Sequence, residues 1–131
     1  MHWHWKTRLV LLLTLHLSAV HYCAAQHLET TEIQRRLQSG DATVVSLALE
    51  SVNEQNSTAD LVPALIEIIE ADEYLSAELA IRALGRMKST ARSAALVLVR
   101  QLHHENYCVR SAAVDALVAI GEDAPRRFLT G

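Results

Sequence analysis

The densest group of chemically versatile side chains is the stretch HHENYC, residues 103–108. Imidazole, carboxylate and thiolate groups are the ligands that zinc and similar metals prefer. His103 and His104 are neighbours, however, and adjacent side chains on a helix point about 100° apart. The segment would have to unwind locally to direct both histidines and Cys108 at one ion. The spacing therefore favours a solvated turn between helices, and we expect no metal and no other cofactor.

Arg110 and Asp115 are the residues that come nearest to a catalytic pair. They stand five positions apart, beyond the three or four that bring side chains together on a helix. The sequence contains no nucleophile elbow, phosphate-binding loop, paired-histidine zinc motif or carboxylate dyad. We therefore expect structural roles for both residues, and a protein that is not an enzyme.

The first 25 residues have the pattern of a secretory signal. Lys6 and Arg8 precede an apolar run from Leu9 to Val20, and Cys23-Ala24-Ala25 then provides small residues ahead of Gln26. The pattern predicts a signal peptide over residues 1–25, cleaved after Ala25, and a secreted or periplasmic protein whose folded domain spans residues 26–131.

An uncleaved membrane anchor is the alternative interpretation of this segment. Its apolar run is twelve residues long and is interrupted by His16. A spanning helix needs roughly 20 apolar residues. The length therefore favours a cleaved signal, with no membrane association afterwards.

The predicted mature chain is acidic. It keeps ten Lys and Arg against fifteen Asp and Glu, a net charge of −5, which argues against a nucleic-acid partner. Cys108 is its single cysteine, so no internal disulfide can form and stability must come from packing.

The elements that hold these residues follow from a repeat of 33 residues. Apolar positions 62, 65, 66 and 69 recur at 95, 98, 99 and 102, and Ala80, Ala83 and Leu84 recur at Ala113, Ala116 and Leu117. At a spacing of 32, Ile33 and Leu37 precede Leu65 and Ile69. Spacings of three and four indicate helices with one apolar face. A helix pair cannot bury such a face alone, so each pair must stack on the next, and alanine allows a close approach.

Breaks in the pattern predict turns between helices of ordinary length. They occur at Gly40-Asp41, Asn56-Ser57, Ala71 to Glu73, Lys88-Ser89 and Glu105-Asn106.

The segments LVPALIEIIEADEYLSAELAIRALGRM and YCVRSAAVDALVAIG resemble the HEAT repeat family, over residues 31–129. In the second segment Val109-Arg110 precedes the alanines and Gly121 ends the helix; in the middle repeat Ser76-Ala77 departs from that pattern. The resemblance implies an all-α fold, a right-handed α-solenoid of antiparallel helix pairs with about three repeats. It also implies that the second helix of each pair lies on the concave side, and that Arg110 and Asp115 serve as a cap or an ion pair between repeats.

Charge is distributed unevenly along this stack. Residues 26–73 carry a net charge of −8 and residues 74–131 a net charge of +3. On the predicted second helices, Glu67 aligns with Arg100 and Glu70 with His103, so the concave face changes sign between repeats. With Arg92, these residues form the candidate surface for a protein or peptide of opposite polarity. A solvated surface without a partner is the alternative.

The sequence thus predicts an exported HEAT-repeat scaffold that binds another protein. One alternative is an enzyme like the HEAT-like phycobilin lyases, which the export signal and the scarcity of aromatic residues (Tyr74, Tyr107 and Phe128 after residue 25) disfavour. The other is a structural role, as part of a larger solenoid or stacked on itself. The carboxyl-terminal repeat favours self-association, because we expect Val114, Leu117, Val118 and Ile120 to be uncovered and Phe128 to follow them.

Overall fold

The computed structural model describes residues 3–71 and 73–122, with side chains for residues 6–18, 29–71 and 73–122. In this part of the chain every regular element is helical. The helices are α1 (Trp3–Leu37), α2 (Ala42–Ser51), α3 (Val62–Glu70), α4 (Tyr74–Met87), α5 (Ala95–Gln101) and α6 (Tyr107–Glu122), with short 3-10 segments η1 (Ala59–Leu61) and η2 (Lys88–Ala94). The predicted all-α fold is confirmed.

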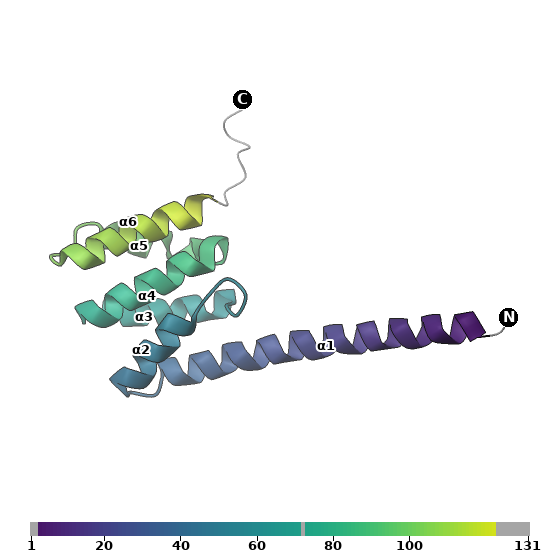
Figure 1. Ribbon diagram of the computed structural model, residues 1–131. Coiled ribbons are helices and arrows are strands. Elements are labelled where there is room, and N and C mark those ends of the chain that lie inside the picture. The colour runs from purple at the N-terminus through teal and green to yellow at the C-terminus, as the bar shows by residue number, and fades with distance from the viewer. Residues whose placement is uncertain (1–2, 72, 123–131) are drawn as a thin grey trace, which may run out of the picture.

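The helices form two layers, as an α-solenoid requires (Figure 1). Helices α2, α4 and α6 stack on one another, and α3 and α5 lie behind them and pack against α4 and α6. The end of α1 packs on α2, while its amino-terminal part extends away from the body. Within this first layer, α2, α4 and α6, helix α4 has a neighbour on either side, and such stacking of one repeat on the next buries the apolar stripes.

Alanine fills the contacts between stacked helices. Ala80, Ala83 and Ala113 expose none of their surface, and Ala116 exposes 2%. A Cβ atom added at Gly85 of α4 would lie 3.1 Å from the Cα atom of Ala116 in α6. The two helices thus approach closely because small residues face each other, as the repeat predicts.

The repeat begins before residue 40, as expected. Ile33 and Leu37 of α1 are buried like their counterparts Leu65 and Ile69 of α3, and all four belong to one continuous core. The last quarter of α1 is therefore a repeat helix in its own right.

The structure corrects three details. Val99, predicted on a buried face, is 45% exposed, because no second helix follows α6 in the described residues to cover it. Ile120, predicted to be uncovered, is 5% exposed, because it occupies the inward position that Met87 holds in α4, and Leu117, from the same prediction, is partly buried against the core. Gly121 does not end its helix, since α6 continues to Glu122.

Local chemistry fixes where the helices begin. The Oδ1 atom of Asp41 accepts hydrogen bonds from the backbone N–H of Thr43 (2.8 Å) and Val44 (3.2 Å), so Asp41 is the N-cap of α2. Pro63 lies in the first turn of α3, where a missing N–H costs nothing. Gly40 has a φ of 74°, the left-handed conformation that favours glycine in the turn before α2.

Two side chains from neighbouring helices close the other end of α2. Arg86 of α4 donates to the carbonyl oxygens of Val52 (2.7 Å) and Leu49 (2.6 Å). Thr30 of α1 donates to the carbonyl oxygen of Asn56 in the loop after α2 (3.0 Å). The bonds from Arg86 satisfy backbone oxygens that a helix end leaves without partners, and together with the bond from Thr30 they join α1, α2 with its loop, and α4.

Helix α1 runs without a break through the predicted cleavage point after Ala25. The signal peptide over residues 1–25 therefore stays a prediction. Within residues 6–18 the large apolar side chains, from Leu9 (48%) to Leu17 (55%), are exposed. Within the described ranges, no helix has both the length and the apolar character needed to cross a membrane.

Candidate protein-interaction surface

The five candidate residues lie along α3 and along the equivalent segment one repeat later, from η2 through α5 to the turn after it. On α3, Pro63, Glu67 and Glu70 are exposed, and we call them the acidic stripe. One repeat later the basic stripe consists of Arg92, Leu96, Val99, Arg100 and His103, all exposed, which run from η2 through α5 to the turn after it. Spacings of three and four residues keep each stripe on one side of its helix.

The two stripes touch at one point. The Nη2 atom of Arg100 lies 4.0 Å from the Oε1 atom of Glu70, and both side chains are more than half exposed. An ion pair of this length between exposed groups contributes little to stability, roughly 0 to 1 kcal/mol, so both charges stay available to a partner. Arg92, in η2, lies at the opposite end of α5 from Arg100 and His103. The structure therefore spreads the candidate positive charges along the whole stripe.

The basic stripe has an apolar centre that we did not predict from the sequence. Leu96 is 78% exposed and Val99 is 45% exposed, between Arg92 and Arg100. Leu96 aligns with Pro63, which lies outside the apolar pattern of its helix at positions 62, 65, 66 and 69. This position outside the pattern is the signal from which the exposure of Leu96 could have been predicted. Two exposed apolar side chains flanked by arginines are a common feature of protein-binding surfaces.

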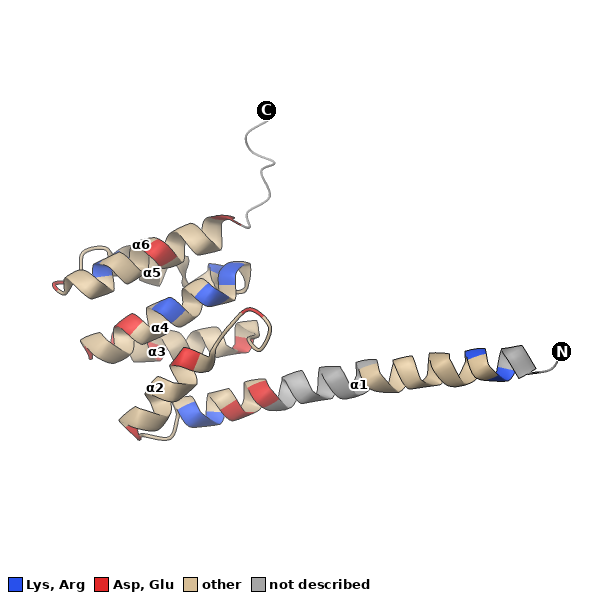
Figure 2. Ribbon diagram, in the orientation of Figure 1, with Lys and Arg blue, Asp and Glu red and all other residues tan. Residues whose placement is uncertain are grey.

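Charge varies along the described body, as Figure 2 shows. Basic residues gather on α4 and the turn after it, between the acidic residues of α2 and α3 and those of α6, Asp115 and Glu122. A partner that crosses both second helices meets carboxylates on α3 and guanidinium groups on η2 and α5.

The turn at residues 103–108 uses its polar groups to start α6. The Nδ1 atom of His104 accepts a hydrogen bond from the backbone N–H of Asn106 (3.0 Å), and the Oδ1 atom of Asn106 accepts one from the N–H of Cys108 (2.8 Å). Among the described residues, no cluster of three or more His, Cys, Asp or Glu side chains could hold a metal ion. The geometry of this segment is that of a helix cap.

Arg110 and Asp115 do not meet as a catalytic pair. Arg110 donates to the carbonyl oxygens of His104 (2.8 Å) and Glu105 (2.7 Å), and its guanidinium carbon lies 5.8 Å from the centre of the Tyr107 ring. Asp115 instead lines a shallow groove between α4 and α6, together with Arg82 and Arg86. Arg110 is thus a cap of the preceding turn, one of the two structural roles expected for it.

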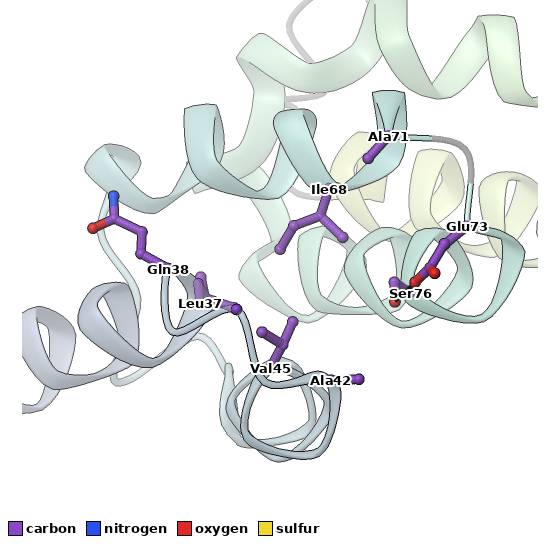
Figure 3. A pocket seen from close by; sticks show the side chains of 9 residues that line it. Leu37, Gln38, Ala42, Val45, Ile68, Ala71, Glu73 and Ser76 are labelled. Atoms are coloured by element: carbon purple, nitrogen blue, oxygen red, sulfur yellow. Dashed lines mark hydrogen bonds between the residues drawn. The ribbon is translucent and has the colours of Figure 1, made fainter.

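A hollow of about 590 Å³ lies where the turn after α1 meets the end of α3 and the start of α4 (Figure 3). Leu37, Val45 and Ile68 form its floor, and Glu73 and Ser76 lie at one side. Glu73 is the one ionisable side chain among the described residues that line it. A single carboxylate beside apolar groups does not form a catalytic set, and none of the five candidate residues reaches this hollow.

The stacked helix pairs and the 33-residue period agree with what comparison with known proteins finds. A family model described as HEAT repeats matches residues 62–131, more than half of the chain. The chain belongs to the HEAT repeat family. A search of curated proteins and a search of solved structures found no match. Helices α3 to α6 lie within the HEAT match. Helix α2 lies outside it, and it stacks on α4 as an equivalent helix of the preceding repeat.

Proposed function

We propose that this HEAT-repeat chain is an exported, non-catalytic scaffold that binds another protein or peptide across the acidic and basic stripes. The observation that carries the proposal is the pair of exposed apolar side chains, Leu96 and Val99, between the arginines of the basic stripe. Export rests on the charge and apolar pattern of residues 1–25.

The stripes determine what such a partner must carry. An apolar side chain would cover Leu96 and Val99, acidic groups would face Arg92 and Arg100, and a basic group would face Glu67 or Glu70. Because the charges are exposed, they steer encounter and select polarity more than they add affinity. An all-anionic ligand such as a nucleic acid would be repelled by the acidic stripe.

A peptide display library provides the test. We expect selection on the wild-type protein to enrich peptides in which an apolar residue is flanked by acidic residues on one side and a basic residue on the other. Binding of these peptides should weaken with added salt, because surface charges are screened over about 8–10 Å at ordinary ionic strength. Reversing Arg92 and Arg100 to glutamate should slow association more than it speeds release.

The control reverses two other exposed arginines, Arg35 and Arg82, which lie on α1 and α4. This variant has the same net charge and should bind as the wild type does. Equal binding by all three proteins, or an affinity that salt does not change, would exclude the stripes as the binding surface.

A second, structural role is favoured by the outer face of α6. Val114 is 51% exposed and Val118 is 54% exposed, on the helix that ends the described stack. We propose that the protein also self-associates through this carboxyl-terminal repeat. Phe128, which we predicted from the sequence to join this surface, lies outside the described residues.

A further inference from the structure

The exposed valines of α6 occupy positions that are covered elsewhere in the same chain. Stepping back by one 33-residue repeat, Val114 corresponds to Ile81 and Val118 to Gly85, both on α4. Ile81 exposes none of its surface, and Gly85 lies against Ala116 of α6. The outer face of α6 is therefore the face on which a first-layer helix of a following repeat would stack.

The opposite end of the stack has the complementary open face. Ala112 of α6 is 1% exposed and its counterpart Leu79 of α4 is half-buried. One repeat earlier, at a spacing of 32, the same position is Leu47 of α2, which is 60% exposed. The exposed face of α2 is thus equivalent to the face by which α4 packs on α2 and α6 packs on α4.

We infer that copies of this chain stack head to tail, with the outer face of α2 in one copy on the outer face of α6 in the next. This inference rests on the self-association proposed above and specifies its geometry. The repeat itself identifies the occupant: in the described residues no first-layer helix covers the outer face of α6 or of α2, and each of these helices is of the kind that would stack on the other. The contact between copies would continue the α2–α4–α6 stack that exists within one copy.

Charge does not select this polarity, because both faces are acidic: Glu50 is exposed on α2, and Asp115 is exposed beside Val114 on α6. The contact therefore depends on the apolar side chains, and added salt should favour it by screening the carboxylates. A heterologous contact of this kind does not close on itself, so the assembly grows with concentration.

Light scattering of the purified protein over a concentration series, with two variants and their mixture, tests the inference. We expect the wild-type mass to rise past that of a dimer. Leu47→Glu blocks the α2 face and Val118→Glu blocks the α6 face, and each variant alone should stay monomeric. Their equimolar mixture should form a dimer and grow no further, because it contains one intact α2 face and one intact α6 face per pair.

As a matched control, Leu75→Glu changes another exposed leucine, 62% exposed in the first turn of α4, and should associate as the wild type does. Loss of association in Val118→Glu but not in Leu47→Glu would mean that two α6 faces pair, which leaves self-association intact and overturns head-to-tail stacking. A monomeric wild type would overturn both. Association that survives both substitutions would come from another surface, such as the apolar part of α1, and would also overturn the inference. Circular dichroism verifies that the variants are folded.

Discussion

At the scale of single residues, Arg86 contributes more to the fold than its place on a solvated helix face suggests. Its guanidinium group binds two carbonyl oxygens at the end of α2. Burial lowers the pKa of Arg86 below its ordinary value, and the charge of Arg82 lowers it further. The group stays charged near neutral pH, because an arginine pKa starts far above that range.

We predict that Arg86→Ala lowers the free energy of unfolding by about 1.5–3 kcal/mol, the range for hydrogen bonds to a charged group. The substitution leaves the carbonyl oxygens of Leu49 and Val52 without this donor. Urea unfolding followed by circular dichroism measures the change.

Arg82→Ala is the matched control, one turn away on the same helix. Arg82 forms an ion pair with Glu78 within α4, at 2.8 Å, and half of its side chain is exposed. Removing it should cost roughly 0 to 1 kcal/mol. If the two variants unfold at the same urea concentration, the bonds from Arg86 to α2 do not stabilise the stack.

At the scale of helices, the contact between α4 and α6 depends on a residue without a side chain. We predict that Gly85→Ala lowers the free energy of unfolding by up to about 2 kcal/mol. The gain in helix propensity, about 1 kcal/mol, is outweighed by crowding against the backbone of Ala116, which costs about 1–3 kcal/mol.

Gly121→Ala makes the same chemical change where there is space. A Cβ atom at Gly121 meets nothing within 4 Å, so this variant should gain up to about 1 kcal/mol from helix propensity. Thermal melts of the two variants should therefore shift in opposite directions. A rise for Gly85→Ala would show that α4 and α6 can separate without cost.

At the scale of the whole molecule, the amino-terminal part of α1 is apolar and lies apart from the stacked body (Figure 1). Removing residues 1–25 would leave Ile33 and Leu37, which pack in the core, on the retained part of the helix. The proposed cleavage is thus compatible with an intact first repeat.

We predict that the exported protein begins at Gln26. Amino-terminal sequencing of the secreted or periplasmic fraction measures this directly. A soluble cytosolic pool that retains Met1 would contradict export, and a start elsewhere would move the cleavage site. The unchanged thermal melt expected of the shortened chain is a separate check that residues 1–25 do not support the fold.

The sequence by itself determined the helical repeat, the positions of most turns and the start of the array before residue 40. These properties are local or periodic: spacings of three and four place Leu65 and Ile69 on one face, Asp41 caps α2 from within its own turn, and the 33-residue period states which helices are equivalent. The same period located Glu67, Glu70, Arg100 and His103 on matching faces.

The tertiary structure decided which members of that periodic pattern are covered. Val99 and Ile120 both satisfy the apolar pattern, yet one is exposed and the other is buried. The difference depends on which neighbouring helix is present, and a pattern within one helix does not contain that information. The bonds from Arg86 to α2 span more than thirty residues of sequence for the same reason. Burial and long-range hydrogen bonds are properties of the pair of surfaces that meet, so they become visible once the stack is assembled.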